Sequence, residues 1–346
     1  MVISKRVLAD DQGCLSVWSV AKLARPTSAI DSVVGSSSIP GRVYATTGDR
    51  RLYVGEGMPL RWRRVSTRIP GKLVAALGRP ETIFAAQRAL YKSNDDGSSW
   101  MRLSCGLILR DVAISPSDAS TIYLAADTVN KATEVLGGLY RTTNGGQSWK
   151  RFTNFPTPNP FEPVVDTVAI HPELPEVVFI GRPVGGVLRS DDGGGHWTFS
   201  RIARGGLGLD GLPIRTIAFG PGPQPILWVG SYRGVWRSDS NGRIWARAGA
   251  VRRPSDRVTV VVPDHVEREL LFGIAEGGVP VRTVDGGKSW SRITGLPPAI
   301  SSLVVEKADR AVYAVDWTSG YGGRSIFRSR DHGVTWTRLP SLPGRP

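Results

Sequence analysis

Short apolar runs separated by polar turns recur along the whole chain in a fixed order. The first run of each unit is apolar, as at 112–114, 168–170, 217–219 and 258–262. A turn containing proline or aspartate follows, and then a second apolar run, as at 122–125, 177–180, 226–229 and 312–315. A third run is short, as at 138–141 and 234–237, and a fourth begins at a tryptophan. Runs of this length bounded by Gly, Pro, Asp and Asn predict strands, so we expect an all-β fold built from four-strand units.

A motif of Ser/Thr-x-Asp-x-Gly-x-x-Trp joins the third run to the fourth and returns about every 46 residues. Clean copies occupy 93–100, 190–197, 283–290 and 329–336. Two further copies, 142–149 and 238–245, keep the frame but replace the acid with Asn144 and Ser240. A seventh is degenerate and retains Trp62. We call this motif the box.

The spacing of the box predicts a structural role and not a catalytic one. Its acid can accept hydrogen bonds from nearby backbone N–H groups, and its first hydroxyl supports the same turn. Its glycine supplies a positive φ, and its tryptophan buries a large surface. The residues assigned to this role are Ser93, Asp95, Gly97, Trp100, Asn144, Gly146, Trp149, Ser190, Asp192, Gly194, Trp197, Ser238, Gly242, Trp245, Asp285, Gly287, Trp290, Ser329, Asp331, Gly333 and Trp336.

Seven units of four strands close most economically as one seven-bladed β-propeller with antiparallel blades, which leaves only short outer edges exposed. We expect the propeller to span residues 30–340 and to be followed by a tail at 341–346. Residues 1–29 form an N-terminal extension. Because Trp18 lies about one repeat before Trp62, this extension is either a ring-closing strand or a disordered tail.

The formal net charge of +14 invites a nucleic-acid interpretation, but the repeat accounts for much of it. A Lys or Arg precedes six boxes, and an Arg follows six box tryptophans by two residues. We expect these cations on outer strands, where they discourage edge pairing. The arginine-rich stretches that remain lack the interleaved aromatics of a single-strand binding groove. Nucleic acid is therefore not the expected principal partner.

Composition indicates no cofactor, metal site or membrane span. No apolar run approaches the ~20 residues of a spanning helix. Cys14 and Cys105 are expected as free thiols, and the four histidines are scattered singly, so no metal site is predicted. Acids at Asp10 and Asp11 interrupt any signal-peptide core, so we expect a cytoplasmic protein, or an extracytoplasmic one if the true start lies elsewhere.

Because it carries these boxes, the chain resembles the BNR/Asp-box propeller superfamily, which includes sialidases, xyloglucanases, sortilin-type domains and photosystem II assembly factors. The resemblance covers nearly the whole chain. It implies that the box turns lie on one face of the ring, whereas the loops between second and third strands and between blades form the face where relatives bind. The residues placed on this candidate binding face are Arg182, Arg204, Arg215, Tyr232, Arg252, Arg253, Trp317, Tyr321 and Arg324.

The resemblance leaves an enzyme and a binding module as alternatives. Arg68-Ile69-Pro70 is similar to a sialidase signature, but its repeat phase matches an ordinary inter-blade linker. A sialidase also needs a tyrosine nucleophile with a glutamate, an acid/base and further arginines, and the spacing of Glu162, Asp166, Asp210, Tyr321 and Arg324 does not select them for these roles. Xyloglucanase relatives clasp a cleft between two propellers, and this chain has length for one.

We therefore interpret the chain as a non-catalytic propeller that presents the loop face to a protein partner, as an assembly or scaffolding factor does. An arginine and aromatic surface suits acidic or amphipathic partners. A glycoside hydrolase of exo-sialidase type, or a glycan-binding lectin-like propeller, is the alternative.

Overall fold

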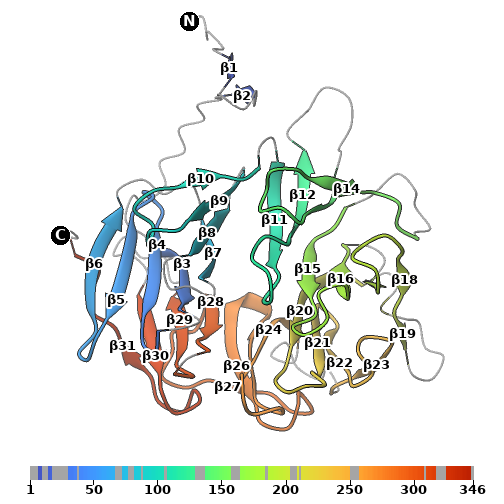
Figure 1. Cartoon of the computed structure of the whole chain (residues 1–346). Helices are drawn as coiled ribbons and strands as arrows, with labels where there is room; N and C mark the ends of the chain where they lie inside the picture. The colour runs from blue at the N-terminus through green and yellow to red at the C-terminus, as the bar shows by residue number, and fades with distance from the viewer. Residues whose placement is uncertain are drawn as a thin grey trace, which may run out of the picture.

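The computed structural model describes residues 7–9, 15–17, 30–36, 39–66, 72–76, 82–86, 89–104, 107–128, 137–156, 164–183, 186–202, 209, 212–249, 257–307, 309–316 and 325–343. Seven antiparallel sheets succeed one another along this part of the chain, each built from four consecutive strands (Figure 1). The all-β, seven-bladed propeller predicted from the repeat is confirmed. Within the described residues, the helical structure is a single 3₁₀ turn, η2 (Glu276–Gly278).

The first three blades run from Ile30 to Phe152, and the strands of each blade are given in chain order. Blade 1 contains β3 (Ile30–Gly35), β4 (Val43–Thr47), β5 (Leu52–Glu56) and β6 (Arg61–Ser66). Blade 2 contains β7 (Lys72–Ala76), β8 (Ile83–Ala86), β9 (Leu90–Ser93) and β10 (Met101–Arg102). Blade 3 contains β11 (Leu107–Ile114), β12 (Ile122–Thr128), β13 (Gly138–Thr142) and β14 (Lys150–Phe152).

The other four blades follow the same plan. Blade 4 contains β15 (Thr167–Ile170), β16 (Val178–Gly181), β17 (Val187–Ser190) and β18 (Thr198–Phe199). Blade 5 contains β20 (Ile214–Phe219), β21 (Leu227–Ser231), β22 (Gly234–Ser238) and β23 (Ile244–Arg247), with β19 (Arg201–Ile202) parallel to β23 at its edge. Blade 6 contains β24 (Val258–Pro263), β25 (Leu271–Ala275), β26 (Val279–Thr283) and β27 (Ser291–Arg292). Blade 7 contains β28 (Ile300–Val305), β29 (Val312–Asp316), β30 (Ile326–Ser329) and β31 (Thr337–Arg338).

Packing of blade 7 against blade 1 closes the ring, and Figure 1 shows their strands side by side. The seam includes Leu342, which is 3% exposed although it lies in the segment expected to be a tail. Trp62 Nε1 donates to the Pro340 carbonyl at 2.9 Å. β1 (Val7–Ala9) and β2 (Leu15–Val17) pair with each other in a separate sheet, and a ring-closing role for residues 1–29 stays a prediction.

The box turns are held by two hydrogen bonds that recur in six blades. The third box residue accepts the N–H of the residue four later, at 2.8–3.0 Å, in every one of them. The first hydroxyl accepts the N–H of the box glycine at 2.8–3.0 Å. Asn144 Oδ1 and Ser240 Oγ take the place of the carboxylate, so the turn survives loss of the acid. The box residues are thus engaged by their own turn.

A buried aromatic occupies the second position of the second strand in all seven blades. These side chains are at most 1% exposed, and they are Tyr44, Phe84, Tyr123, Phe179, Trp228, Phe272 and Tyr313. Several reach the box of the following blade: the Tyr123 hydroxyl donates to the Gly193 carbonyl at 3.1 Å. In four blades the aromatic thus packs against the box of the next blade, at Asp96, Gly193, Gly242 and Gly333.

The cations that precede the boxes lie on the third strand, directly opposite these aromatics. Arg237 stacks over Trp228 at 5.3 Å, and Arg141 stacks over Tyr123 at 5.5 Å. The prediction that the cations preceding the boxes lie on outer strands was wrong. They lie on the third strand, and the fourth strand, which begins near the box tryptophan, lies outside the third in each blade. Each such contact contributes about 0.5–1 kcal/mol or more, so the structure confirms that these charges belong to the scaffold.

Candidate functional site

Antiparallel order within each blade divides the connections between two faces of the ring. The first-to-second-strand turns and the boxes lie at one end of every blade, which we call the box face. The second-to-third-strand turns and the inter-blade connections lie at the other end, which we call the loop face. This division follows from strand direction alone.

A charged network on the loop face joins three neighbouring blades. Arg110 of β11 donates from Nε to Asp127 at 2.8 Å and from its terminal nitrogen to Asp166 at 2.7 Å. Asp127 is near the end of β12, and Asp166 directly precedes β15 of the next blade. Arg215 of β20 approaches the other oxygen of Asp166 at 3.8 Å. Arg110 and Arg215 remain 39% and 45% exposed, so both guanidinium groups are accessible.

Arg215 and Tyr232 form an exposed pair. The Arg215 guanidinium donates to the Tyr232 hydroxyl at 2.9 Å and lies 5.2 Å from the ring centre. Tyr232 is 45% exposed in the turn between β21 and β22. The pair therefore presents an aromatic face and a fixed cation together, the combination that dominates many protein interfaces.

Backbone irregularity places both arginines of this network. The pairing of first and second strands shifts register between Leu109 and Asp111, and again between Ile214 and Thr216. Arg110 and Arg215 are the extra residues at these two bulges. A bulge re-aims the side chain it carries, which is why equivalent positions in different blades meet at one place.

Asp111 clamps the innermost strands of blades 3 and 4. Its carboxylate accepts hydrogen bonds from the Thr167 hydroxyl at 2.7 Å and the Val168 N–H at 3.0 Å, both on β15. The Val112 N–H donates to the other oxygen at 2.9 Å. Burial raises the pKa of Asp111, and these three hydrogen bonds offset only part of that effect.

The sequence placed nine residues on the candidate binding face, and the structure brings Arg215 and Tyr232 together there. Arg182 is 2% exposed, with Nε 3.4 Å from the Val164 carbonyl, so its side chain is packed between blades and is not presented to a partner. The other six lie outside the described residues: Arg204, Arg252, Arg253, Trp317, Tyr321 and Arg324. Arg68, Cys14 and Cys105 also lie outside them.

Sequence reasoning missed Arg110 and Asp127 and gave Asp166 no role on the binding face. The charged pair Arg110-Asp111 near the start of an apolar strand was the available signal, because a charge there is unusual for a buried run. Among the described residues, no group of three or more His, Cys, Asp or Glu side chains is arranged to hold a metal ion. No helix in the described part of the chain is long and apolar enough to cross a membrane.

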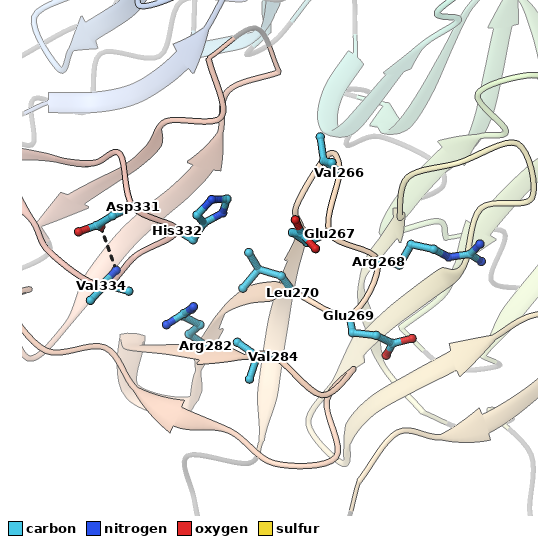
Figure 2. Close-up of a pocket in the computed structure, with 10 residues that line it drawn as sticks. All are labelled: Val266, Glu267, Arg268, Glu269, Leu270, Arg282, Val284, Asp331, His332 and Val334. Atoms are coloured by element: carbon cyan, nitrogen blue, oxygen red, sulfur yellow. Dashed lines mark hydrogen bonds between the residues drawn. The ribbon is translucent and has the colours of Figure 1, made fainter.

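The box face carries clefts between blades. One of about 670 Å³ lies between blades 6 and 7, where Glu267 and His332 lie on opposite sides (Figure 2). Val266, Val284 and Val334 line it and are 56–64% exposed. Exposed valines at turn positions that are polar in most other blades make this a second candidate contact surface.

Comparisons with known proteins support the fold. No family model matches the chain. It is 26% identical over 330 residues to a xyloglucanase of Paenibacillus sp, an alignment that covers 68% of this chain and 31% of the relative. A xyloglucanase of Hypocrea jecorina is 23% identical over 280 residues, covering 74% of this chain and 30% of the relative. The chain spans about a third of the length of these curated relatives.

Two kinds of solved protein structure are similar in fold to this chain. YCF48 bound to a D1 peptide is similar with a TM-score of 0.51 at 14% identity, covering 90% of this chain and 82% of that one. A GH74 xyloglucanase from Xanthomonas campestris is similar with a TM-score of 0.53 at 19% identity, covering 91% of this chain and 45% of that one. At such identities the likeness concerns the propeller fold, and membership of the Asp-box superfamily stays a prediction.

Proposed function

We propose that the chain is a non-catalytic binding protein whose loop face receives a segment of a protein partner of acidic or amphipathic character. The observation that carries this proposal is the Arg215–Tyr232 pair, which is exposed and yet fixed by a 2.9 Å hydrogen bond. A cation and an aromatic ring already held in position lose little entropy on binding.

Charge on the loop face favours an acidic segment. Arg110 is paired with Asp127 and Asp166, whereas the firmest bond of Arg215 goes to a neutral hydroxyl. The sequence analysis predicts four further arginines on the same face, Arg204, Arg252, Arg253 and Arg324. Guanidinium groups in this number match carboxylates, to which they can donate two hydrogen bonds each. That a similar propeller, YCF48, was solved with a peptide bound supports a protein partner.

Binding to a synthetic library of acidic peptides, and to its charge-inverted counterpart, tests the proposal. Acidic peptides should bind saturably at moderate salt, and Arg215→Ala should weaken the best of them about tenfold or more, because a hydrogen bond to a charged group contributes about 1.5–3 kcal/mol. Arg268→Ala removes the same charge from the box face and should leave affinity unchanged. Equal binding of both libraries, or equal loss in both variants, would contradict the assignment.

A glycan-directed function is the second candidate, because the curated relatives are xyloglucanases. Incubation with xyloglucan and with sialosides, followed by measurement of released sugar, tests this candidate directly. Release of sugar would place the hydrolase ahead of the binding protein. No release and no retention on xyloglucan resin would remove the glycan-directed candidate.

A further inference from the structure

The interface between blades 4 and 5 lacks an acid that two other described interfaces have. In blades 3 and 5, the third-strand arginine reaches an acid in the first turn of the next blade: Arg141 lies 3.4 Å from Glu176, and Arg237 lies 2.8 Å from Glu269. Each acid stands three residues before the buried aromatic of its strand. In blade 5 this position is Pro225, so Arg189 of blade 4 faces a neighbour that offers no carboxylate.

A cleft of about 500 Å³ lies at this interface, between the outer strands of blade 4 and the box of blade 5. Arg189, Ser200 and Arg243 are among the residues that line it. Arg189 and Ser200 are each 5% exposed, and the buried Arg189 Nε and Ser200 Oγ have no hydrogen-bond partner. Unpaired polar atoms at this depth are costly, typically about 1–3 kcal/mol each, so two in one cleft wall point to a ligand that satisfies them.

Both of these atoms donate hydrogen bonds, and the local charge is positive. Asp191 binds the two terminal nitrogens of Arg189, which leaves Nε as its unpaired donor. Arg243 supplies a second guanidinium close enough to lower the pKa of Arg189, an effect that adds to the larger one of burial. With two arginines and one aspartate, the net charge of the group is about +1.

We propose that this cleft binds an oxyanion, that is, the carboxylate, sulfate or phosphate group of a small ligand. The Arg189 Nε–H, the Ser200 hydroxyl and the Arg243 guanidinium are the donors. Two guanidinium donors and a hydroxyl that can also donate, in a group of net positive charge, favour an anion over a cation or a neutral sugar. This site is separate from the loop face and does not depend on the function proposed there.

Calorimetric titration of the full chain with sulfate, phosphate and acetate, each against chloride at matched ionic strength, tests the site. We expect saturable binding of at least one anion, and the anion bound most tightly identifies the ligand class. Arg243→Gln and Ser200→Ala should each raise its Kd about tenfold or more. Ser200→Ala should melt no lower than the wild type without anion, because the hydroxyl it removes has no partner.

Arg233→Gln is the matched control, since Arg233 is exposed in the turn between β21 and β22 on the loop face. It removes the same charge and should leave the Kd unchanged. Absence of binding by all three anions would overturn the proposal. So would an equal loss of affinity in Arg233→Gln and Arg243→Gln, since that would show only the attraction of a chain of net charge +14.

Discussion

Gly242 is a position where one added carbon would disturb the interface between two blades. It is the box glycine of blade 5, with φ of 72°, and a Cβ there would lie 2.1 Å from Cε1 of Phe179. Phe179 is fully buried in blade 4, between strands on both sides, and has no room to withdraw. Gly242→Ala therefore combines backbone strain with an overlap that forces the two blades apart.

Comparison with Gly277 separates the cost of backbone strain from the cost of overlap. Gly277 has φ of 78° and nothing within 4 Å of its Cβ position. Gly277→Ala should cost only the left-handed strain, about 1–2 kcal/mol. Gly242→Ala should add overpacking of about 1–3 kcal/mol, and more if the Ser238 hydrogen bond to Gly242 breaks. In thermal melts followed by circular dichroism, each kcal/mol lowers the Tm by about 2 °C. Equal Tm values for the two variants would refute the packing argument.

Three further predictions concern the turns and the inner clamp. Ser190→Ala strands the buried Gly194 N–H and should lower the free energy of unfolding by about 1–3 kcal/mol in urea titrations, whereas Ser190→Thr, the residue used at Thr142, should restore it. Because the pKa of Asp111 is raised, the stability it adds is lost as pH rises, so the Tm of wild type relative to Asp111→Asn should fall as pH rises above about 4; a constant difference would contradict this. Hydrogen bonds from the Ser99 hydroxyl and N–H lower the pKa of Asp95 to about 2, so this carboxylate stabilises the fold above about pH 4 and loses its effect as pH falls towards 2, which acid titration of wild type and Asp95→Asn measures.

The fold could be predicted because the box is a local signal. Its hydroxyl, acid and glycine bond within eight residues, as at Ser93 to Trp100, so the sequence spacing carries the whole geometry. The buried aromatic is as regular as the box, yet its role depends on a partner in the next blade. Tyr123 meets Gly193 across 70 positions of sequence, and no local pattern reveals such a contact. The all-β propeller was therefore predictable, whereas the placement of its cations was not.

The candidate site was less predictable, because its position depends on backbone detail. Arg110 and Arg215 come together with Asp166 through bulges that shift the strands by one residue, and a bulge has no firm signature in these apolar runs. Arg182 and Arg215 look alike in sequence, since both stand near loop-face turns. The former is packed between blades at 2% exposure, whereas the latter is 45% exposed. Burial of an arginine is decided by its neighbours in space.

Departures from the repeat tell more about function than the repeat itself does. The acid that pairs with the third-strand arginine at Glu176 and Glu269 is replaced by Gly41, Ser120, Pro225 and Arg310 in blades 1, 3, 5 and 7. Clefts lie at three of the four interfaces that these blades form with the preceding blade, between blades 4 and 5, 6 and 7, and 7 and 1. Where Glu176 and Glu269 are present, the arginine of the preceding blade forms an ion pair across the interface. Absence of the acid accompanies a cleft at three interfaces, and at the interface between blades 4 and 5 the unpaired Arg189 Nε lies beside that cleft's other polar groups.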